Sequence, residues 1–192
     1  MKMSTPCIVL LAVLCVVACG TGSEEVVTEA TEETPVKPEP VITLLDRPFS
    51  AEQIRDEWVE GFHLKIRRWT PEAEAFEEWT VVSADTDGVD IESLSFDGEG
   101  GVVTEPSTQR STWIQLRDHA SFPADRATRE AVTRDTTLGE LSGWLYVVGD
   151  PSGEVVTELF FAEALPGAPV TVHVIKGGEL AEIFEQIERS RP

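Results

Sequence analysis

Three histidines are the residues of this 192-residue chain best suited to bind a metal or to transfer a proton near neutral pH: His63, His119 and His173. They lie far apart, and no HExxH, HxH or cysteine and histidine spacing of a metal site links them. His63 and His173 occupy polar positions of segments that alternate in polarity. We therefore expect a solvent-facing or strand-edge role for them, and we predict neither a metal site nor a cofactor.

Two further segments match reactive motifs only in part. Ser142 precedes Gly143, but no Gly-x-Ser-x-Gly motif of an activated serine is present, and we predict no catalytic residue. Asp85, Asp87 and Asp90 are spaced like some calcium ligands. Glycine at the fourth position and the lack of an oxygen-bearing side chain at the fifth depart from an EF-hand loop, so a hairpin turn is favoured over a calcium site.

The stretch with the most specific chemistry is residues 16–20, VVACG. It follows Lys2 and an apolar run at positions 8–18, which is shorter than the roughly 20 residues of a membrane-spanning helix but typical of an export signal. This stretch resembles the lipobox of bacterial lipoproteins. The resemblance implies a diacylglycerol thioether and an acylated amine on Cys19, with palmitate-like chains anchoring the protein in a lipid bilayer; the alternative is an ordinary secretory signal. The residues that signal peptidase would recognise are Val16, Val17 and Ala18.

The anchor hypothesis divides the chain into three parts: a signal peptide at 1–18, a lipidated cysteine and tether at 19–42, and a β-rich domain at 43–192. The tether is acidic and proline-rich without aromatic residues, a composition typical of a disordered linker. After cleavage Cys19 is the only thiol, so no internal disulfide is expected. Gly20, in place of the aspartate of an inner-membrane retention signal, favours the outer membrane, with the domain in the periplasm or on the cell surface.

The domain carries a strongly negative charge. Residues 43–192 hold 29 acidic and 13 basic side chains, a formal charge of −16. Such a surface repels nucleic acid and anionic lipid head groups, so neither is an expected partner of the domain. The expected partners are the bilayer, through Cys19, and an apolar ligand or an envelope protein.

Alternating polarity and turn residues predict the elements of the domain. We expect an α+β fold, a curved antiparallel β-sheet or half-barrel of eight or nine strands with two short helices. Residues 70–78 are predicted as a turn, and residues 180–187 fit a strand better than a helix. The expected helices span 50–59 and start again at 111–113, and the expected strands lie near 62–67, 79–82, 89–96, 102–104, 128–134, 143–148, 155–161 and 170–175.

The second half of the chain carries a further resemblance. The runs TTLGELSGWLYVV and ELFFAEALPGAPV, within residues 111–187, resemble the ends of several uncharacterised bacterial lipoprotein families whose half-barrel is similar to the carriers LolA and LolB. The resemblance implies an apolar concave face that takes acyl chains without catalytic residues.

Four aromatic residues are the candidates for a ligand pocket, with packing in the core as the alternative: Trp58, Trp113, Trp144 and Phe160. The leading hypothesis is a membrane-anchored exported lipoprotein with a non-catalytic binding or structural domain. The alternative is a periplasmic carrier or chaperone for a lipid or lipoprotein, and an enzyme is a third possibility.

Overall fold

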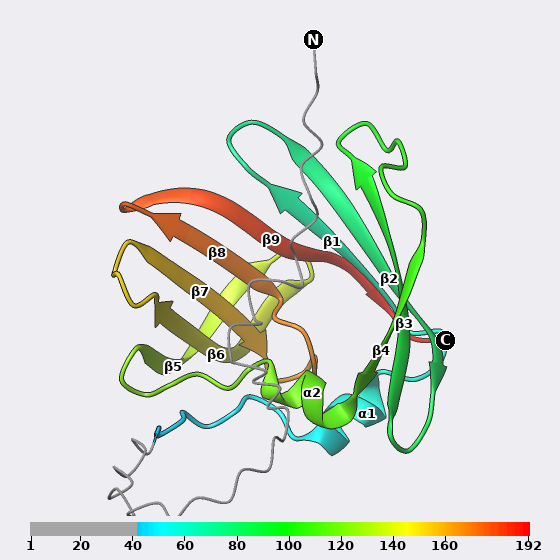
Figure 1. Ribbon diagram of the computed structural model, residues 1–192, viewed down its shortest axis with the longest axis horizontal. Helices are drawn as coiled ribbons and strands as arrows, with labels where there is room; N and C mark the ends of the chain where they lie inside the picture. The colour runs from blue at the N-terminus through cyan, green and yellow to red at the C-terminus, as the bar shows by residue number, and fades with distance from the viewer. Residues whose placement is uncertain (1–41) are drawn as a thin grey trace, which may run out of the picture. The chain divides into compact units, whose positions relative to one another are not determined.

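Both helices of the domain begin at capping boxes, which the sequence encodes locally. In the computed structural model, which describes residues 42–192 (Figure 1), the backbone N–H of Gln53 donates to Ser50 Oγ at 3.2 Å, and Ser50 N–H donates to Gln53 Oε1 at 2.8 Å. Thr112 and Gln115 repeat this exchange at the second helix. These reciprocal bonds satisfy two N–H groups that a helix start leaves unpaired. The predicted helix starts are confirmed.

Nine antiparallel strands form a single open sheet in the order β4-β3-β2-β1-β9-β8-β7-β6-β5. Consecutive strands of the sequence are therefore neighbours in the sheet, except β4 and β5, which form its two opposite edges; β9 lies between β8 and β1. The predicted fold class is confirmed. The elements follow the chain as α1 (Ala51–Glu57), β1 (His63–Trp69), β2 (Glu74–Ala84), β3 (Gly88–Asp97), β4 (Ser107–Thr112), α2 (Trp113–Asp118), β5 (Ala127–Thr136), β6 (Gly139–Gly149), β7 (Val155–Ala162), β8 (Thr171–Lys176) and β9 (Glu179–Ser190).

The turn predicted over residues 70–78 is wrong, because β2 already begins at Glu74 and pairs there with Trp69. The acidic run has the polarity of a loop, but its residues from Glu74 to Glu78 all pair with β1. Lys65 Nζ lies 2.8 Å from Glu78 Oε1 and 5.7 Å from the centre of the Phe76 ring. Cross-strand partners thus make an acidic segment compatible with a strand.

The strand predicted at residues 102–104 is also wrong. Val102 forms only an isolated bridge with Phe96, and the true partner of β3 is β4, which begins at Ser107. The Asp97 carboxylate accepts hydrogen bonds from the backbone N–H groups of Glu99 and Gly101. The segment between β3 and β4 is therefore a loop up to Ser107.

The C-terminal segment is a strand, as predicted. β9 pairs with β8 through a tight turn at Gly177 and Gly178, where both φ angles are positive, and it pairs along its other side with β1. The 12 residues of β9 thus join β1–β4 and β5–β8 in a single sheet.

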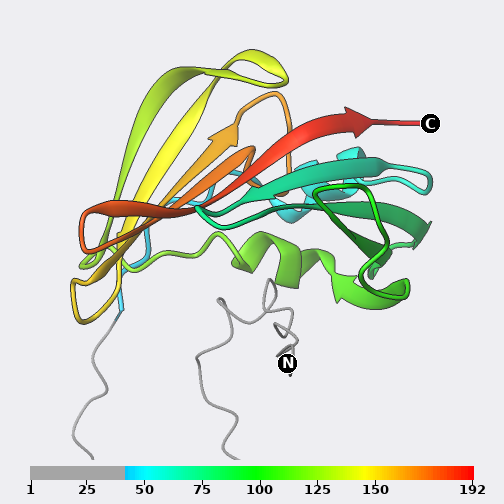
Figure 2. The same ribbon diagram turned by 90° about the horizontal axis from the view of Figure 1, so that it is seen from above.

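The sheet has two faces with different coverings, and Figure 2 shows α2 on one side and the β5–β6 hairpin rising on the other. We call the side that carries α1 and α2 the helix face and the opposite side the open face. The main core lies on the helix face and consists of Phe49, Ile54, Trp58, Phe62, Leu64, Ile66, Val81, Val89, Trp113, Ala120, Phe122, Ala127, Tyr146 and Phe161. A smaller core lies on the open face where the hairpin covers it, and consists of Leu145, Phe160, Ala162 and Val170.

Candidate binding groove on the open face of the sheet

The aromatic residues predicted to line one pocket are divided between the two faces. Trp58 and Trp113, 2% and 5% exposed, lie on the helix face, and Trp144 lies at the margin of the same core. Phe160 is fully buried in the smaller core on the open face. Adjacent positions of a strand point to opposite faces, so Phe161 lies beside Trp144 and Phe160 does not. These four residues therefore do not form one site.

Aromatic side chains occupy the space between the helices and the sheet. Trp58 stacks on Phe62 with ring centres 5.2 Å apart, and its indole N–H donates to the Pro166 carbonyl at 3.0 Å. Trp113 Nε1 donates to the Asp85 carbonyl at 2.9 Å. Both indoles are thus packed and hydrogen-bonded, as expected of core residues.

A cavity of about 470 Å³ lies on the open face, where the tip of the β5–β6 hairpin reaches across β8, β9 and β1. We call it the open-face groove. The hairpin tip is held in place by Thr137, whose backbone N–H and Oγ1 donate to Glu185 Oε1 at 3.2 and 2.6 Å. The groove is lined by Arg67, Trp69, Arg134, Asp135, Thr136, Thr171, His173, Leu180, Ile183 and Glu185.

The floor of the groove is apolar and accessible to solvent. Trp69 and Leu180 are 38% and 41% exposed, and Ile183 lies directly across from Trp69 in the β1–β9 register. Exposed Trp and Leu side chains gathered around one concave surface indicate a binding site more than scattered surface residues do.

The charged side chains around this floor are largely paired with one another. Arg67 Nη2 lies 2.5 Å from Glu185 Oε2, and both His173 Nδ1 and Arg134 Nη2 lie within 3.7 Å of Glu158 Oε2. Burial opposes ionisation of Glu185, but hydrogen bonds from Thr137 and the charge of Arg67 outweigh it and lower the pKa of this carboxyl. The groove thus combines an apolar floor with an electrically balanced rim.

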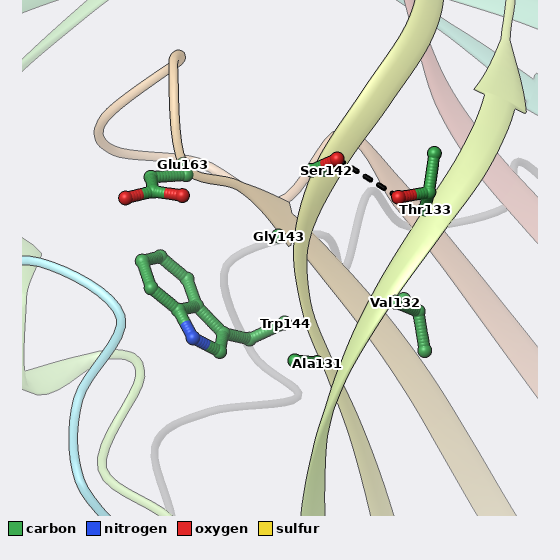
Figure 3. A pocket seen from close by; sticks show the side chains of 7 residues that line it. All are labelled: Ala131, Val132, Thr133, Ser142, Gly143, Trp144 and Glu163. Atoms are coloured by element: carbon green, nitrogen blue, oxygen red, sulfur yellow. Dashed lines mark hydrogen bonds between the residues drawn. The ribbon is translucent and has the colours of Figure 1, made fainter.

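A smaller cavity of about 260 Å³ lies at the edge of the sheet beside β5 (Figure 3). Its hydroxyls, Ser142 Oγ and Thr133 Oγ1, are 2.8 Å apart and hydrogen-bonded to each other, while the Glu163 carboxylate faces the Trp144 ring. The lining, which is Ala131, Val132, Thr133, Ser142, Gly143, Trp144 and Glu163, includes no histidine to activate Ser142. We call this cavity the edge pocket.

The histidines lie at three separate places. His63 is 3.9 Å from Glu78, His173 contacts Glu158, and burial lowers the pKa of His119 at the end of α2. Within residues 42–192, no three histidine, cysteine, aspartate or glutamate side chains are close enough to hold a metal ion.

The predicted Asp-Gly turn at 85–88 is present. Asp85 Oδ1 accepts the N–H groups of Asp87 and Gly88, and its carboxylate also binds Arg110, which lowers the pKa of Asp85 to about 2. Arg110 also pairs with Asp90 at 3.1 Å. Two of the three carboxylates considered as calcium ligands, Asp85 and Asp90, are thus engaged with an arginine.

Cys19 and the signal-peptidase positions Val16, Val17 and Ala18 lie outside the described residues. In the part of the chain that the structure covers, no helix is long and apolar enough to cross a membrane.

The groove was not predicted from the sequence. Trp69 has the pattern of a core residue, and Leu180 falls in a segment with two competing interpretations. The signal that remains in the sequence is the position of each at the end of a strand, beside a turn, but the bend of the β5–β6 hairpin over β9 is a tertiary feature.

Comparison with known proteins gives similarity of fold only. No protein-family model matches the chain, and no curated protein matches it. Among solved structures, MucB in complex with MucA(peri) has a TM-score of 0.50 and 13% sequence identity over 73% of this chain. The structure of MucB has a TM-score of 0.50 and 14% sequence identity over 71% of this chain. The MucA/MucB complex of Pseudomonas aeruginosa scores 0.48 at 16% identity over 72% of this chain. The chain spans about half the length of these proteins, covering 53%, 55% and 54% of them, respectively.

Proposed function

We propose that this chain is an exported, lipid-anchored and non-catalytic binding protein whose domain takes a segment of an envelope protein into the open-face groove. The observation that carries the proposal is the exposed apolar floor formed by Trp69, Leu180 and Ile183 beneath the β5–β6 hairpin. Cys19 would hold the domain at a membrane surface, and the tether would give it reach.

A protein segment fits the groove better than an acyl chain does. An apolar centre with a charged rim, rich in Trp and Arg, is the usual anatomy of a protein interface. A LolA-like carrier would need an open apolar cavity under the helices. In this structure Trp58, Trp113 and their neighbours occupy that space. The similarity in fold to MucB, which was solved in complex with MucA(peri), is compatible with protein binding but covers about half of that protein.

The binding part of the proposal is tested by co-purification with matched variants. Leu180→Glu puts a charge on the groove floor, whereas Gln109→Glu puts the same charge on exposed β4. The full chain is expressed in its native host, solubilised in mild detergent and purified. We expect one or a few proteins to be recovered with the wild type and Gln109→Glu but lost with Leu180→Glu. Equal recovery with both variants would refute the groove as the site.

The anchor is tested separately by metabolic acyl labelling of Cys19→Ala. We expect the variant to lose the label and to leave the membrane fraction, because several acyl chains are needed for durable attachment. A labelled, membrane-bound variant would contradict the assignment of Cys19.

A further inference from the structure

We infer that the free edge of β5 and the edge pocket together form a strand-addition site for an extended protein segment that carries a lysine or arginine. This inference deepens the proposed function, since it names a chemistry for the protein partner at a second surface. It rests on which backbone N–H and C=O groups of β5 point away from β6, on the shape of the edge pocket and on the charge of Glu163.

β5 is the less protected of the two edges of the sheet. It runs for ten residues without a proline and pairs with β6 from Ala127 to Thr136 without a register shift. The opposite edge, β4, has six residues and follows Pro106 directly. A long and regular edge strand is a template for another strand, whereas short strands and prolines protect an edge.

The backbone phase of β5 follows from one hydrogen bond. Gly149 N–H donates to the Arg126 carbonyl at 2.9 Å, immediately beyond the pair of Ala127 with Val148. In an antiparallel ladder, hydrogen-bonded pairs alternate with pairs that are not hydrogen-bonded. Since Arg126 is bonded to Gly149, the N–H and C=O groups of the next residue, Ala127, point away from β6, and so do those of every second residue after it.

Ala131 and Thr133 therefore present their N–H and C=O groups along the free edge, and both are exposed. Within residues 42–192 neither backbone N–H donates to a protein acceptor outside the β5–β6 ladder.

The side chains of these same residues face the edge pocket. In the register, Ala131 pairs with Trp144 and Thr133 pairs with Ser142. A strand added opposite Ala131 would project its own side chain onto this face, next to a residue with only a methyl group. The small side chain of Ala131 thus opens the way from the edge to Trp144.

The pocket selects a basic side chain. Glu163 is exposed, its carboxylate faces the Trp144 ring in Figure 3, and it takes part in none of the ion pairs of the described residues. A lysine or arginine stem can lie along the indole while its cation reaches the carboxylate. The guanidinium carbon of Arg129 is already 5.0 Å from the Trp144 ring centre, so the incoming cation is held by Glu163 and only its apolar stem lies on the indole. The formal charge of −16 on residues 43–192 adds to the preference.

The test uses synthetic heptapeptides with the full chain. The probe is acetyl-Thr-Val-Thr-Lys-Thr-Val-Thr-amide, and matched probes carry Glu or norleucine in place of Lys, or an N-methyl group on the central residue. Binding is followed by NMR shifts and by hydrogen exchange of the Ala131 and Thr133 amides. We expect the Lys probe to bind and to slow exchange at both amides, the Glu probe to bind at least about tenfold more weakly, and the N-methyl probe not to bind.

Variants of the domain separate the two parts of the inference. Glu163→Gln should weaken binding of the Lys probe about threefold to fivefold and remove most of the difference in affinity between the Lys and norleucine probes. The control is Glu130→Gln, because Glu130 is an exposed carboxylate on the opposite face of β5, and this variant should leave both affinities unchanged. Ala131→Pro removes an outward N–H without removing a β5–β6 hydrogen bond, and should abolish binding of every probe.

Equal affinity for the Lys and Glu probes, or unchanged binding by Ala131→Pro, would overturn the inference. A dimer through β5, detected by light scattering and lost in Ala131→Pro, would also overturn it, because a second copy would then cover the edge. These failures are distinct from failure of the proposed function, which is read from the Leu180→Glu variant at the open-face groove.

Discussion

The indole N–H of Trp58 donates to the Pro166 carbonyl at 3.0 Å, and this bond fixes the connection between β7 and β8 against the end of α1. The same connection is held from β9, where Gln186 Nε2 donates to the carbonyls of Ala168 and Pro169 at 3.1 and 2.9 Å. Three elements distant in the sequence therefore meet at one loop, and the stability of the fold should depend on it.

Gly167 is the most sensitive position of this loop. Its φ is +117°, and a Cβ there would lie 2.3 Å from Trp58 Nε1. We expect Gly167→Ala to lower the free energy of unfolding by about 3 kcal/mol, through backbone strain and a steric clash. Gly153→Ala is the control, since Gly153 also has a positive φ but nothing lies within 4 Å of the added carbon. Urea denaturation should show a larger loss of stability for Gly167→Ala than for Gly153→Ala. Similar losses would mean that the clash with Trp58 does not destabilise the variant.

Arg189 joins the same region to α1 by a buried ion pair. Its side chain is 5% exposed, Nη2 lies 3.1 Å from Glu57 Oε1 and 2.8 Å from the Pro166 carbonyl, and burial lowers its pKa. Arg189→Met leaves a carboxylate and a carbonyl without this partner, and we expect a loss of about 3 kcal/mol. Arg191→Met removes a second, more exposed partner of Glu57 and should cost less than about 1 kcal/mol. Thermal denaturation of the two variants checks that Arg189→Met loses more stability than Arg191→Met. A larger loss for Arg191→Met would contradict the prediction.

The contact that holds the hairpin over the groove should weaken in acid. The pKa of Glu185 is lowered, so its contacts with Thr137 and Arg67 stabilise the fold above the ordinary value of 4.5 and are lost as pH falls through the folded-state pKa. We expect Glu185→Ala to be less stable than the wild type by roughly 1 kcal/mol at pH 7. The difference should shrink below pH 4.5. Denaturation at several pH values measures it, and a difference independent of pH would rule out the ionised carboxylate as its cause.

Substitutions on the groove floor should leave the fold intact. Leu180 is 41% exposed, so we expect Leu180→Glu to change the free energy of unfolding by no more than about 0.5 kcal/mol. Circular dichroism and urea denaturation check this. A loss of several kcal/mol would show that Leu180 belongs to the core, and the groove assignment would then fail.

The sequence predicts what is local and leaves open what depends on tertiary structure. The capping residues Ser50 and Thr112 lie at the helix starts expected at 50 and at 111–113, and alternating polarity predicts most strands. The acidic run before Trp79 has no local signal of a strand, because its partner, Lys65, lies on another strand.

The candidate sites depend on register and bending, which no local pattern contains. Alternation separates Phe160 from Phe161, but it does not tell which of them faces the helices. Between Lys65 and Ile66, and between Val174 and Ile175, the register of β9 relative to its two neighbours also shifts by one residue, because Ile187 and Ala181 of β9 have no partner there. Trp69 and Leu180 line one groove only because the end of β1, the start of β9 and the hairpin tip converge on the open face.

Photo-cross-linking from the groove floor tests the central claim most directly. A photoreactive phenylalanine is placed at position 180 or, as a control, at position 109 of the full chain, and cells of the native host are irradiated. We expect a discrete protein adduct from position 180 that is absent from position 109. A lipid adduct from position 180, or the same protein adducts from both positions, would contradict the claim that the open-face groove binds a segment of an envelope protein.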